Sequence, residues 1–227
     1  MQNESEIRKK ILDIGKRMYD RRMVASNDGN ISVKLNDHEF LCTPTGVSKG
    51  FMTEDMLCKV DENGKLIDPD YPYRPSSEVK MHMVVYRKRP DVTAVVHAHP
   101  IYSTVFAAAG LPLDMPVLAE AVTYIGSVPL AKFGTPSTVE VPDSIEEFLD
   151  DYDAVLLESH GALTYGDDLI RAWYKMEAVE FYAEILYKLK LMGDVKVFDK
   201  DTVEKLYDMR RAMDLPGRHP AVKRKDN

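Results

Sequence analysis

The sequence predicts a single α/β domain. Apolar residues recur at helical spacing near both ends of the chain, and short β-branched runs lie between them. No internal repeat or low-complexity linker divides the 227 residues, and the composition does not shift midway. A chain of this length can bury roughly 70% of its unfolded surface in one core, so it needs no disulfide or metal merely to fold. One domain over residues 1–227 is therefore expected.

The helices are predicted from apolar spacing and from residues that favour helix ends. Ile7, Ile11, Ile14 and Met18 recur at the 4-3-4 spacing of one helical face, which predicts a first helix. Ser76-Ser77-Glu78 is typical of a helix start, and Pro90 would stop that helix. Further helices are expected at residues 103–109, in a short acidic segment capped by Ser144, from Asp167 onward, and at about 203–213, followed by a loose tail over 218–227.

The strands are predicted from alternation and from β-branched runs. Residues 31–35 alternate between apolar and polar, and residues 40–42 follow after Asn36-Asp37, which indicates a hairpin. Glu62-Asn63-Gly64-Lys65 is a second hairpin signal. Residues 93–99 and 153–158 are expected to be buried strands, with a short strand at 127–130.

Composition limits the classes of partner. With 30 basic and 37 acidic residues the net charge is −7, which argues against the basic face that nucleic-acid binding needs. Cys42 and Cys58 are too few for a disulfide scaffold and are expected to be buried, inert thiols. No apolar run is long enough to span a membrane, and the polar N-terminus does not have the pattern of a secretory signal. We expect a soluble, cytoplasmic protein.

His97-Ala98-His99 is the sharpest chemical signal. Residues i and i+2 of a strand point to the same face, so both imidazoles can reach one metal ion. His160, after another apolar strand, could supply a third ligand, and three histidines with an open position are typical of a catalytic metal. Two ordinary histidines near a strand end would explain the pair alone equally well. The remaining histidines, His38, His82 and His219, lie in a turn, a helix and the tail, which are poorer positions for ligands.

Ser76-Ser77-Glu78 admits two interpretations. It could be a simple helix cap, or the two hydroxyls and the helix N-terminus could bind a phosphate while Glu78 acts as acid or base. Loops containing Gly29-Asn30 and Thr45-Gly46 could add backbone N–H groups to the same anion. No P-loop or dinucleotide fingerprint is present, which argues against a nucleotide.

Taken together, these segments resemble the class II aldolase/adducin family. The matching segments, in the family's order, are Gly29-Asn30-Ile31-Ser32, Thr43-Pro44-Thr45-Gly46, Ser76-Ser77-Glu78, Val96-His97-Ala98-His99, Phe133-Gly134-Thr135 and Ser159-His160-Gly161. They span about residues 6–190. The resemblance implies a mixed or antiparallel sheet in a three-layer α/β/α arrangement, and a homotetramer with active sites between subunits.

The resemblance also implies an activity and a role for each site residue. Zn²⁺, or Mn²⁺ or Co²⁺, would be held by His97, His99 and His160, with Glu78 as acid/base. The phosphate of a small-molecule sugar phosphate would be bound by Gly29, Asn30, Thr45, Gly46, Ser76 and Ser77. The expected reaction cleaves a ketose 1-phosphate similar to L-fuculose 1-phosphate into dihydroxyacetone phosphate and an aldehyde such as lactaldehyde.

Other members of the family suggest alternatives. A ribulose-5-phosphate 4-epimerase would have Asp where Glu78 stands, and a methylthioribulose-1-phosphate dehydratase or an adducin-like interaction domain would share the fold. The aldolases take an aldehyde-side tyrosine from a neighbouring subunit. Here Met115 or Pro116 falls at that place, with Tyr102 and Tyr124 nearby.

Overall fold

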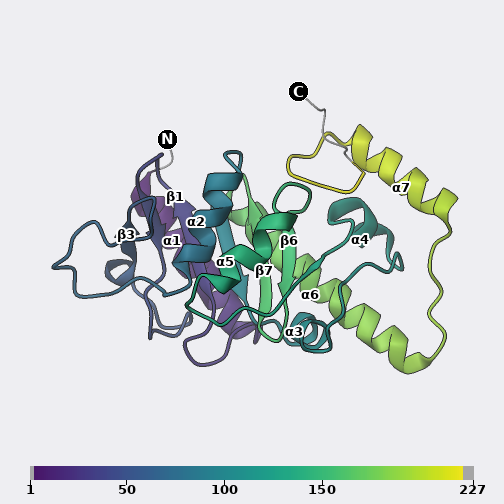
Figure 1. Cartoon of the computed structure of the whole chain (residues 1–227), viewed down its shortest axis with the longest axis horizontal. Helices are drawn as coiled ribbons and strands as arrows, with labels where there is room; N and C mark the ends of the chain where they lie inside the picture. Colours follow the sequence, from purple (N-terminus) through teal and green to yellow (C-terminus); the bar gives the residue numbers. More distant parts are fainter. Residues whose placement is uncertain (1–2, 222–227) are drawn as a thin grey trace.

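A mostly antiparallel sheet forms the centre of the molecule. In the computed structural model, residues 3–221 are described and contain a seven-stranded sheet in the order β3-β2-β1-β4-β7-β6-β5 (Figure 1). The strands are β1 (Asn30–Lys34), β2 (Phe40–Cys42), β3 (Cys58–Val60), β4 (Ala94–Ala98), β5 (Leu130–Ala131), β6 (Ala154–Leu157) and β7 (Gly161–Gly166). Among these strands only β5 and β6 pair in parallel. The predicted mixed sheet is confirmed.

Helices cover both faces of this sheet. The α-helices are α1 (Glu4–Asp20), α2 (Val79–Lys88), α3 (Ile101–Ala108), α4 (Ala119–Tyr124), α5 (Glu140–Ile145), α6 (Leu169–Met192) and α7 (Lys200–Ala212), with 3-10 turns at Glu54–Met56 and Glu146–Phe148. Apolar side chains of α1, α3, α4 and α6 pack with Val96 and Ala98 of β4. Those of α2 and α5 pack with Val95 on the opposite face. The layers are therefore α/β/α, as the family resemblance implies.

Side-chain caps fix the starts of several helices. Asn3 accepts from the backbone N–H of Ser5 at α1, and Asp168 accepts from that of Arg171 at α6. Each acceptor satisfies a backbone donor that has no partner within its helix. The long helix thus begins at Leu169, two residues after the predicted Asp167.

Two local expectations were wrong, and strands β3 and β7 and helix α4 were not predicted. Ser144 does not cap the acidic helix, because the helix already begins at Glu140 and Ser144 lies inside it. The Ser144 hydroxyl donates to the carbonyl of Val141. Strand β7 was not expected, since its glycine-bounded sequence has little β-branched character.

The tail is the second wrong expectation. Residues 218–221 are not loose, because buried His219 bonds through Nε2 to the carbonyl of Val122 and accepts at Nδ1 from the N–H of Ala221. Residues 222–227 of the expected tail lie outside the described part.

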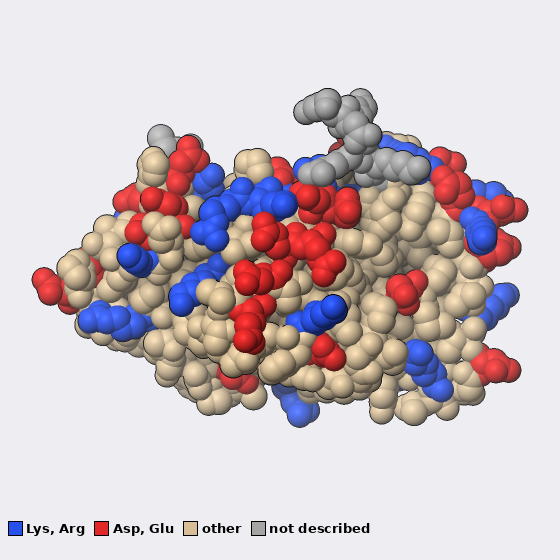
Figure 2. Space-filling model, viewed as in Figure 1, with Lys and Arg blue, Asp and Glu red and all other residues tan. Residues whose placement is uncertain are grey.

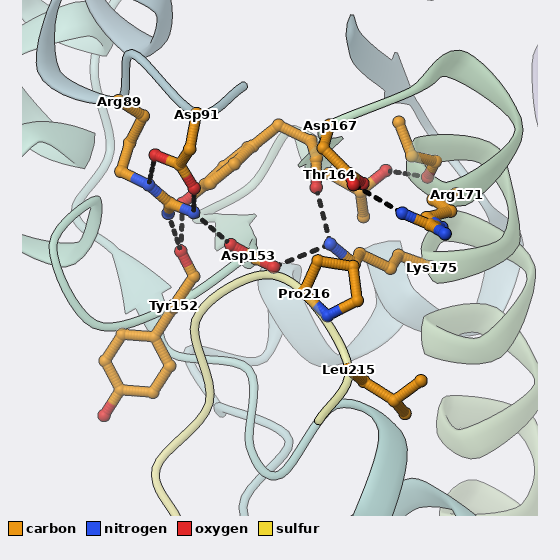
Figure 3. A network of polar contacts seen from close by, with 12 residues as sticks. Arg89, Asp91, Tyr152, Asp153, Thr164, Asp167, Arg171, Lys175, Leu215 and Pro216 are labelled. Atoms are coloured by element: carbon orange, nitrogen blue, oxygen red, sulfur yellow. Dashed lines mark hydrogen bonds and ion pairs between the residues drawn. The ribbon is translucent and has the colours of Figure 1, made fainter. Parts of the chain in front are cut away.

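A buried charge network lies at the end of the sheet where β6 begins (Figure 3). The Arg89 guanidinium contacts the carboxylates of Asp91 and Asp153 at 2.8 Å each, and Lys175 reaches Asp153 at 2.6 Å. Gly217, with φ +96°, approaches Asp153 so closely that a Cβ there would collide with the carboxylate. The network therefore joins the end of α2, the start of β6, α6 and the C-terminal segment.

Surface charges of both signs are interspersed on the face shown in Figure 2. Acidic side chains gather over α5 and the turn that follows it, and basic side chains of α2 lie beside them. Lys88, for example, lies 3.8 Å from both Glu146 and Asp150.

Cys42 and Cys58 are buried and unbonded, and burial raises the pKa of both thiols, in agreement with the sequence. Within residues 3–221, no helix is both long and apolar enough to cross a membrane.

Candidate metal centre

Strand β4 and the turn between β6 and β7 bring three histidines together. His97 lies within β4 and His99 directly follows it, so both project to the same side. His160 lies in the tight β6–β7 turn, next to the end of β4 because Ala98 pairs with Ala162. A Cβ at Gly161 would collide with the carbonyl of Ala98 and the ring of His99, so glycine permits this close approach.

The three imidazoles form a nearly regular triangle. Their ring centroids lie 4.8 to 4.9 Å apart, and the planes are inclined by 63 to 68°. One ring nitrogen of each histidine lies within 4.8 Å of the others, and Nε2 of His97 is 3.1 Å from Nε2 of His99. Two nitrogens bound tetrahedrally to one ion at about 2.0–2.1 Å would be about 3.3 Å apart. The cluster therefore has the dimensions of a metal centre.

The outward-facing ring nitrogens show that the donor set fits a cation. Nδ1 of His97 lies 2.9 Å from the carbonyl oxygen of Ala162, which requires a proton on Nδ1 and leaves a lone pair on Nε2. Nδ1 of His99 faces the Asp28 carboxylate at 3.4 Å, which favours the same tautomer. Both lone pairs then face the same point, an arrangement that a positive ion between them stabilises.

Burial keeps two of these histidines in the neutral form, which is the form able to bind a metal. It lowers the pKa of His97 well below the usual value, although the charge of Glu78 raises it. It also lowers the pKa of His99, with a further decrease from His160 and an opposing effect of Asp28. Both imidazoles are therefore neutral near pH 7 and free to donate a lone pair.

Glu78 points into the same cluster. It occupies the N-cap position of α2 but makes no side-chain cap bond. Its carboxylate oxygens instead lie 3.4 Å from Nε2 of His97 and 3.1 Å from Nε2 of His160, and Asn30 donates to Oε2 at 2.9 Å. Burial raises the pKa of Glu78, but the two histidines and the bond from Asn30 outweigh it and hold the pKa well below its usual value. The simple capping interpretation therefore does not describe Glu78.

The loops expected to bind phosphate lie side by side. Pro44 and Pro75 form an isolated antiparallel bridge, Thr45 donates its N–H to the carbonyl of Arg74, and Ser76 donates to that of Thr43. Thr45, Gly46 and Ser77 are exposed, and no described atom lies near the side-chain direction of Gly46. This pairing brings the Thr45-Gly46 and Ser76-Ser77 segments to one place, beside Glu78.

Gly29 brings the remaining predicted residues to the cluster. Its φ of +74° is a conformation that other residues rarely adopt, and a Cβ there would lie 2.9 Å from the carbonyl oxygen of His97. Asn30 follows as the first residue of β1 and pairs with His97 in the sheet. All the predicted site residues are thus gathered around one end of β4.

Two further residues at the site were not found from the sequence. Asp28 faces His99, as described above, and Ser137 shares a hydrogen bond of 2.8 Å with the Ser77 hydroxyl. Ser137 has a φ of +68°, unusual for serine, and sits in the loop after the Phe133-Gly134-Thr135 segment. In the sequence, Asn27-Asp28-Gly29-Asn30 is typical of a helix break, which gives Asp28 no separate role. Ser137 lies 60 residues from Ser77, and a lone serine carries no signal.

Tyrosine is absent from the contacts of the cluster. Within residues 3–221, no hydrogen bond, ion pair or ring contact joins a tyrosine to the three histidines. Tyr102 lies on α3 and packs against Tyr187, and Tyr124 ends α4. Within the described residues, these contacts therefore supply no tyrosine for the aldehyde side of the site.

Comparison with known proteins gives the same assignment. The profile of the family described as Class II Aldolase and Adducin N-terminal domain matches residues 9–187. The chain belongs to this family.

Its relatives in this class II aldolase family differ in activity. An L-fuculose phosphate aldolase from Methanococcus vannielii is 35% identical over 194 residues, covering 85% of this chain and 98% of the relative. A 3-oxo-tetronate 4-phosphate decarboxylase from Escherichia coli is 31% identical over 195 residues, covering 84% and 89%. A solved structure of L-fuculose 1-phosphate aldolase superimposes with a TM-score of 0.82 at 27% identity, covering 93% of this chain and 98% of that one. Family and histidine cluster together identify a metal-dependent aldolase or lyase.

Proposed function

We propose that this class II aldolase cleaves a ketose 1-phosphate, with L-fuculose 1-phosphate as the first candidate, into dihydroxyacetone phosphate and an aldehyde such as lactaldehyde. One observation carries the proposal: a carboxylate held by Asn30 contacts two histidines of a three-histidine cluster, beside paired serine and glycine loops. Similarity to the fuculose phosphate aldolases supports it.

The metal is proposed as one divalent cation, Zn²⁺ in preference to Mn²⁺ or Co²⁺, because imidazole suits zinc. His97, His99 and His160 would hold it. When bound, it supplies the electrophilic stabilisation that an enediolate needs, since this chemistry proceeds without a Schiff-base lysine.

The chain's own residues then position the substrate and move one proton. Thr45, Gly46, Ser76 and Ser77, with Gly29 and Asn30, would bind the phosphate and so place carbon 3 near Glu78. In the direction of synthesis, Glu78 removes a proton from carbon 3 of dihydroxyacetone phosphate. In cleavage the 4-hydroxyl gives up its proton as the bond between carbons 3 and 4 breaks, and Glu78 in its protonated form delivers a proton to carbon 3, so one proton is lost and one is gained. The lowered pKa keeps Glu78 ionised and so free to accept a proton, but it also makes the carboxylate a weak base, which substrate binding would have to offset.

The test is a retro-aldol screen of ketose 1-phosphates with coupled detection of dihydroxyacetone phosphate, together with metal analysis of the purified protein. We expect about one divalent ion per chain and cleavage of at least one ketose 1-phosphate. No bound metal and no cleavage would favour an adducin-like interaction domain. Bound metal without cleavage would direct attention to an epimerase or a dehydratase of the family.

Decarboxylation of a 3-oxo-tetronate 4-phosphate is the second candidate. Its support is the 31% identity to a decarboxylase over 84% of the chain. Loss of carbon dioxide also leaves an electron pair beside a carbonyl, so the same metal and phosphate groups would serve. Release of carbon dioxide without an aldehyde product distinguishes it from the aldolase.

We also propose a cytoplasmic homotetramer with active sites between subunits. Large apolar side chains exposed on α6 support an interface there: Phe181 is 59% exposed, Leu191 71% and Met192 83%. Light scattering after size exclusion should give four times the chain mass of 25.8 kDa. A monomer would contradict this part of the proposal.

A further inference from the structure

Lys49 is a buried cation close to the proposed phosphate loops. Lys49 is only 2% exposed, although lysine is rarely found fully buried. The ammonium donates to the carbonyl oxygens of Asn27 at 3.0 Å and Val47 at 2.8 Å. Its backbone packs against α1, where a Cβ on Gly15 would lie 3.0 Å from the Lys49 carbonyl oxygen. The amino group is therefore fixed in place.

The two carbonyls belong to the two loops that approach the site from different parts of the chain. Asn27 precedes Asp28-Gly29-Asn30, which contacts His99, the backbone of His97 and Glu78. Val47 follows Thr45-Gly46. The Lys49 ammonium thus ties the loop beside the metal centre to the loop proposed to bind the phosphate.

This cation has no carboxylate contact. Across the described residues, no acidic oxygen lies within 4.0 Å of the Lys49 ammonium, whereas buried Lys175 and Arg89 both contact Asp153 (Figure 3). Burial lowers the pKa of Lys49 to about 8, while the charges of Asp28 and Glu78 raise it. The group is therefore mainly charged at pH 7. A buried positive charge without a contacting anion is costly, and a bound anion would offset that cost.

The proposed cradle itself lacks a cation. The predicted residues Gly29, Asn30, Thr45, Gly46, Ser76 and Ser77 offer only uncharged groups, and the N–H groups of Thr45 and Ser76 already donate to the carbonyls of Arg74 and Thr43. A phosphate carries one to two negative charges, and a buried cation nearby acts through a medium of lower effective dielectric constant than water. We propose that Lys49 is a positioning residue and the positive charge of the anion site, drawing a substrate phosphate to the two loops it holds together. This inference rests on the proposed function.

The test measures anion affinity directly, by calorimetry with inorganic phosphate on the metal-loaded protein. Lys49→Met keeps the side-chain volume and removes the charge. We expect a loss of phosphate affinity of about 10-fold to 100-fold with unchanged metal content, and a similar increase in KM for the cleaved ketose 1-phosphate with little change in kcat. Lys175→Met is the matched control: it removes another buried lysine at the far end of the sheet and should leave phosphate affinity unchanged.

A second measurement needs no variant. Sulfate keeps a constant charge between pH 7 and 10 by its own chemistry, so its affinity for the wild-type protein should fall as the pH rises through about 8, where Lys49 loses its proton. A neutral amine can still donate to both carbonyls, so a purely structural role predicts no such fall. Asp28 and Glu78 are the acidic groups whose charges act on Lys49.

The outcomes separate this inference from the proposed function. Equal phosphate affinity in Lys49→Met and wild type, equal losses in both lysine variants, or sulfate affinity that stays level across pH 8 would each overturn the role of Lys49. Phosphate binding that depends on Lys49, without cleavage of any ketose phosphate, would instead overturn the aldolase proposal alone. Wild-type protein that binds neither anion would overturn both.

Discussion

The side-chain amide of Asn30 donates to Oε2 of Glu78 at 2.9 Å, although 48 residues separate them in the chain. Asn30 also pairs with His97 across β1 and β4. One position of the sheet therefore aligns the proposed proton-transfer group with a proposed metal ligand. The acid/base and the metal centre share a rigid support, which is what a catalytic geometry requires.

Replacing Asn30 tests this support. Asn30→Ala should lower kcat by roughly 10-fold or more, because a hydrogen bond to a charged group contributes about 1.5–3 kcal/mol. Metal content should stay at the wild-type value, since the three histidines are intact. Asn36→Ala, in the β1–β2 turn, is the control. A kcat equal to wild type would show that Glu78 does not depend on the amide.

Glu78→Gln separates catalysis from stability. If Glu78 transfers the proton, the exchange of the C3 proton of dihydroxyacetone phosphate with solvent should slow by roughly 10²–10⁴-fold. Metal content and melting temperature should change little, because the amide is nearly isosteric and Glu78 makes no cap bond in α2. The exchange reports the half-reaction without the aldehyde side. Wild-type exchange with metal retained would place the base elsewhere.

His97→Ala should abolish metal retention and turnover together. The substitution removes one of the three proposed ligands, and two histidines alone would hold an ion much less tightly. Metal analysis after dialysis, by mass spectrometry, measures the loss. His38→Ala, at an exposed turn, should retain the metal. A His97→Ala protein with full metal content would disprove the assignment.

The hydroxyl contact between Ser77 and Ser137 predicts that the loop after Gly134 contributes to phosphate binding. Ser137→Gly keeps the φ of +68° accessible and removes the hydroxyl, whereas Ser137→Ala removes the hydroxyl and strains the backbone. Both should raise KM for the ketose 1-phosphate several-fold if the hydroxyl matters, as the loss of one hydrogen bond implies. If only Ser137→Ala is impaired, the loop conformation matters and the hydroxyl does not.

His219 should make stability depend on pH. Burial lowers its pKa from 6.5 to about 4, so the unfolded chain binds the proton more tightly and stability is lost as the pH falls from about 6.5 towards 4. Between pH 7 and 5 this residue should lower the free energy of unfolding by about 2 kcal/mol. Urea unfolding at both pH values, in wild type and His219→Asn, measures the difference. His82, with a pKa lowered to about 3 by burial, acts in the same direction, so the variant should reduce the dependence without removing it.

The sequence predicts this fold well where local pattern and burial agree. The spacing of Ile7, Ile11, Ile14 and Met18 marks the buried face of α1, and the β-branched run before His97 marks β4. Strand β7 escaped prediction because it is fixed by its neighbours β4 and β6 more than by its own residues. Its tight turn is nevertheless what brings His160 to the other two histidines.

The candidate site was predictable in its chemistry but not in its supports. Histidine spacing and Ser-Ser-Glu are local signals, and the structure brings those residues to one end of β4. Three supporting residues reach the site only because the fold brings distant segments together. Lys49 contacts Asn27, Asp28 contacts His99, and Ser137 contacts Ser77. Nothing in the sequence near a lone lysine indicates that it will be buried without a carboxylate.

Gly217 has a consequence for how the protein is made. Its backbone lies against Asp153, whose carboxylate already contacts Arg89 and Lys175. Residue 217 therefore completes a buried charge network whose first member in the chain is Arg89. A ribosome releases the chain from its N-terminus, and the buried charges stay accessible to water until residue 217 has left the exit tunnel. Synthesis should therefore pass through a state in which every strand of the sheet has been made but this end of the sheet is still open.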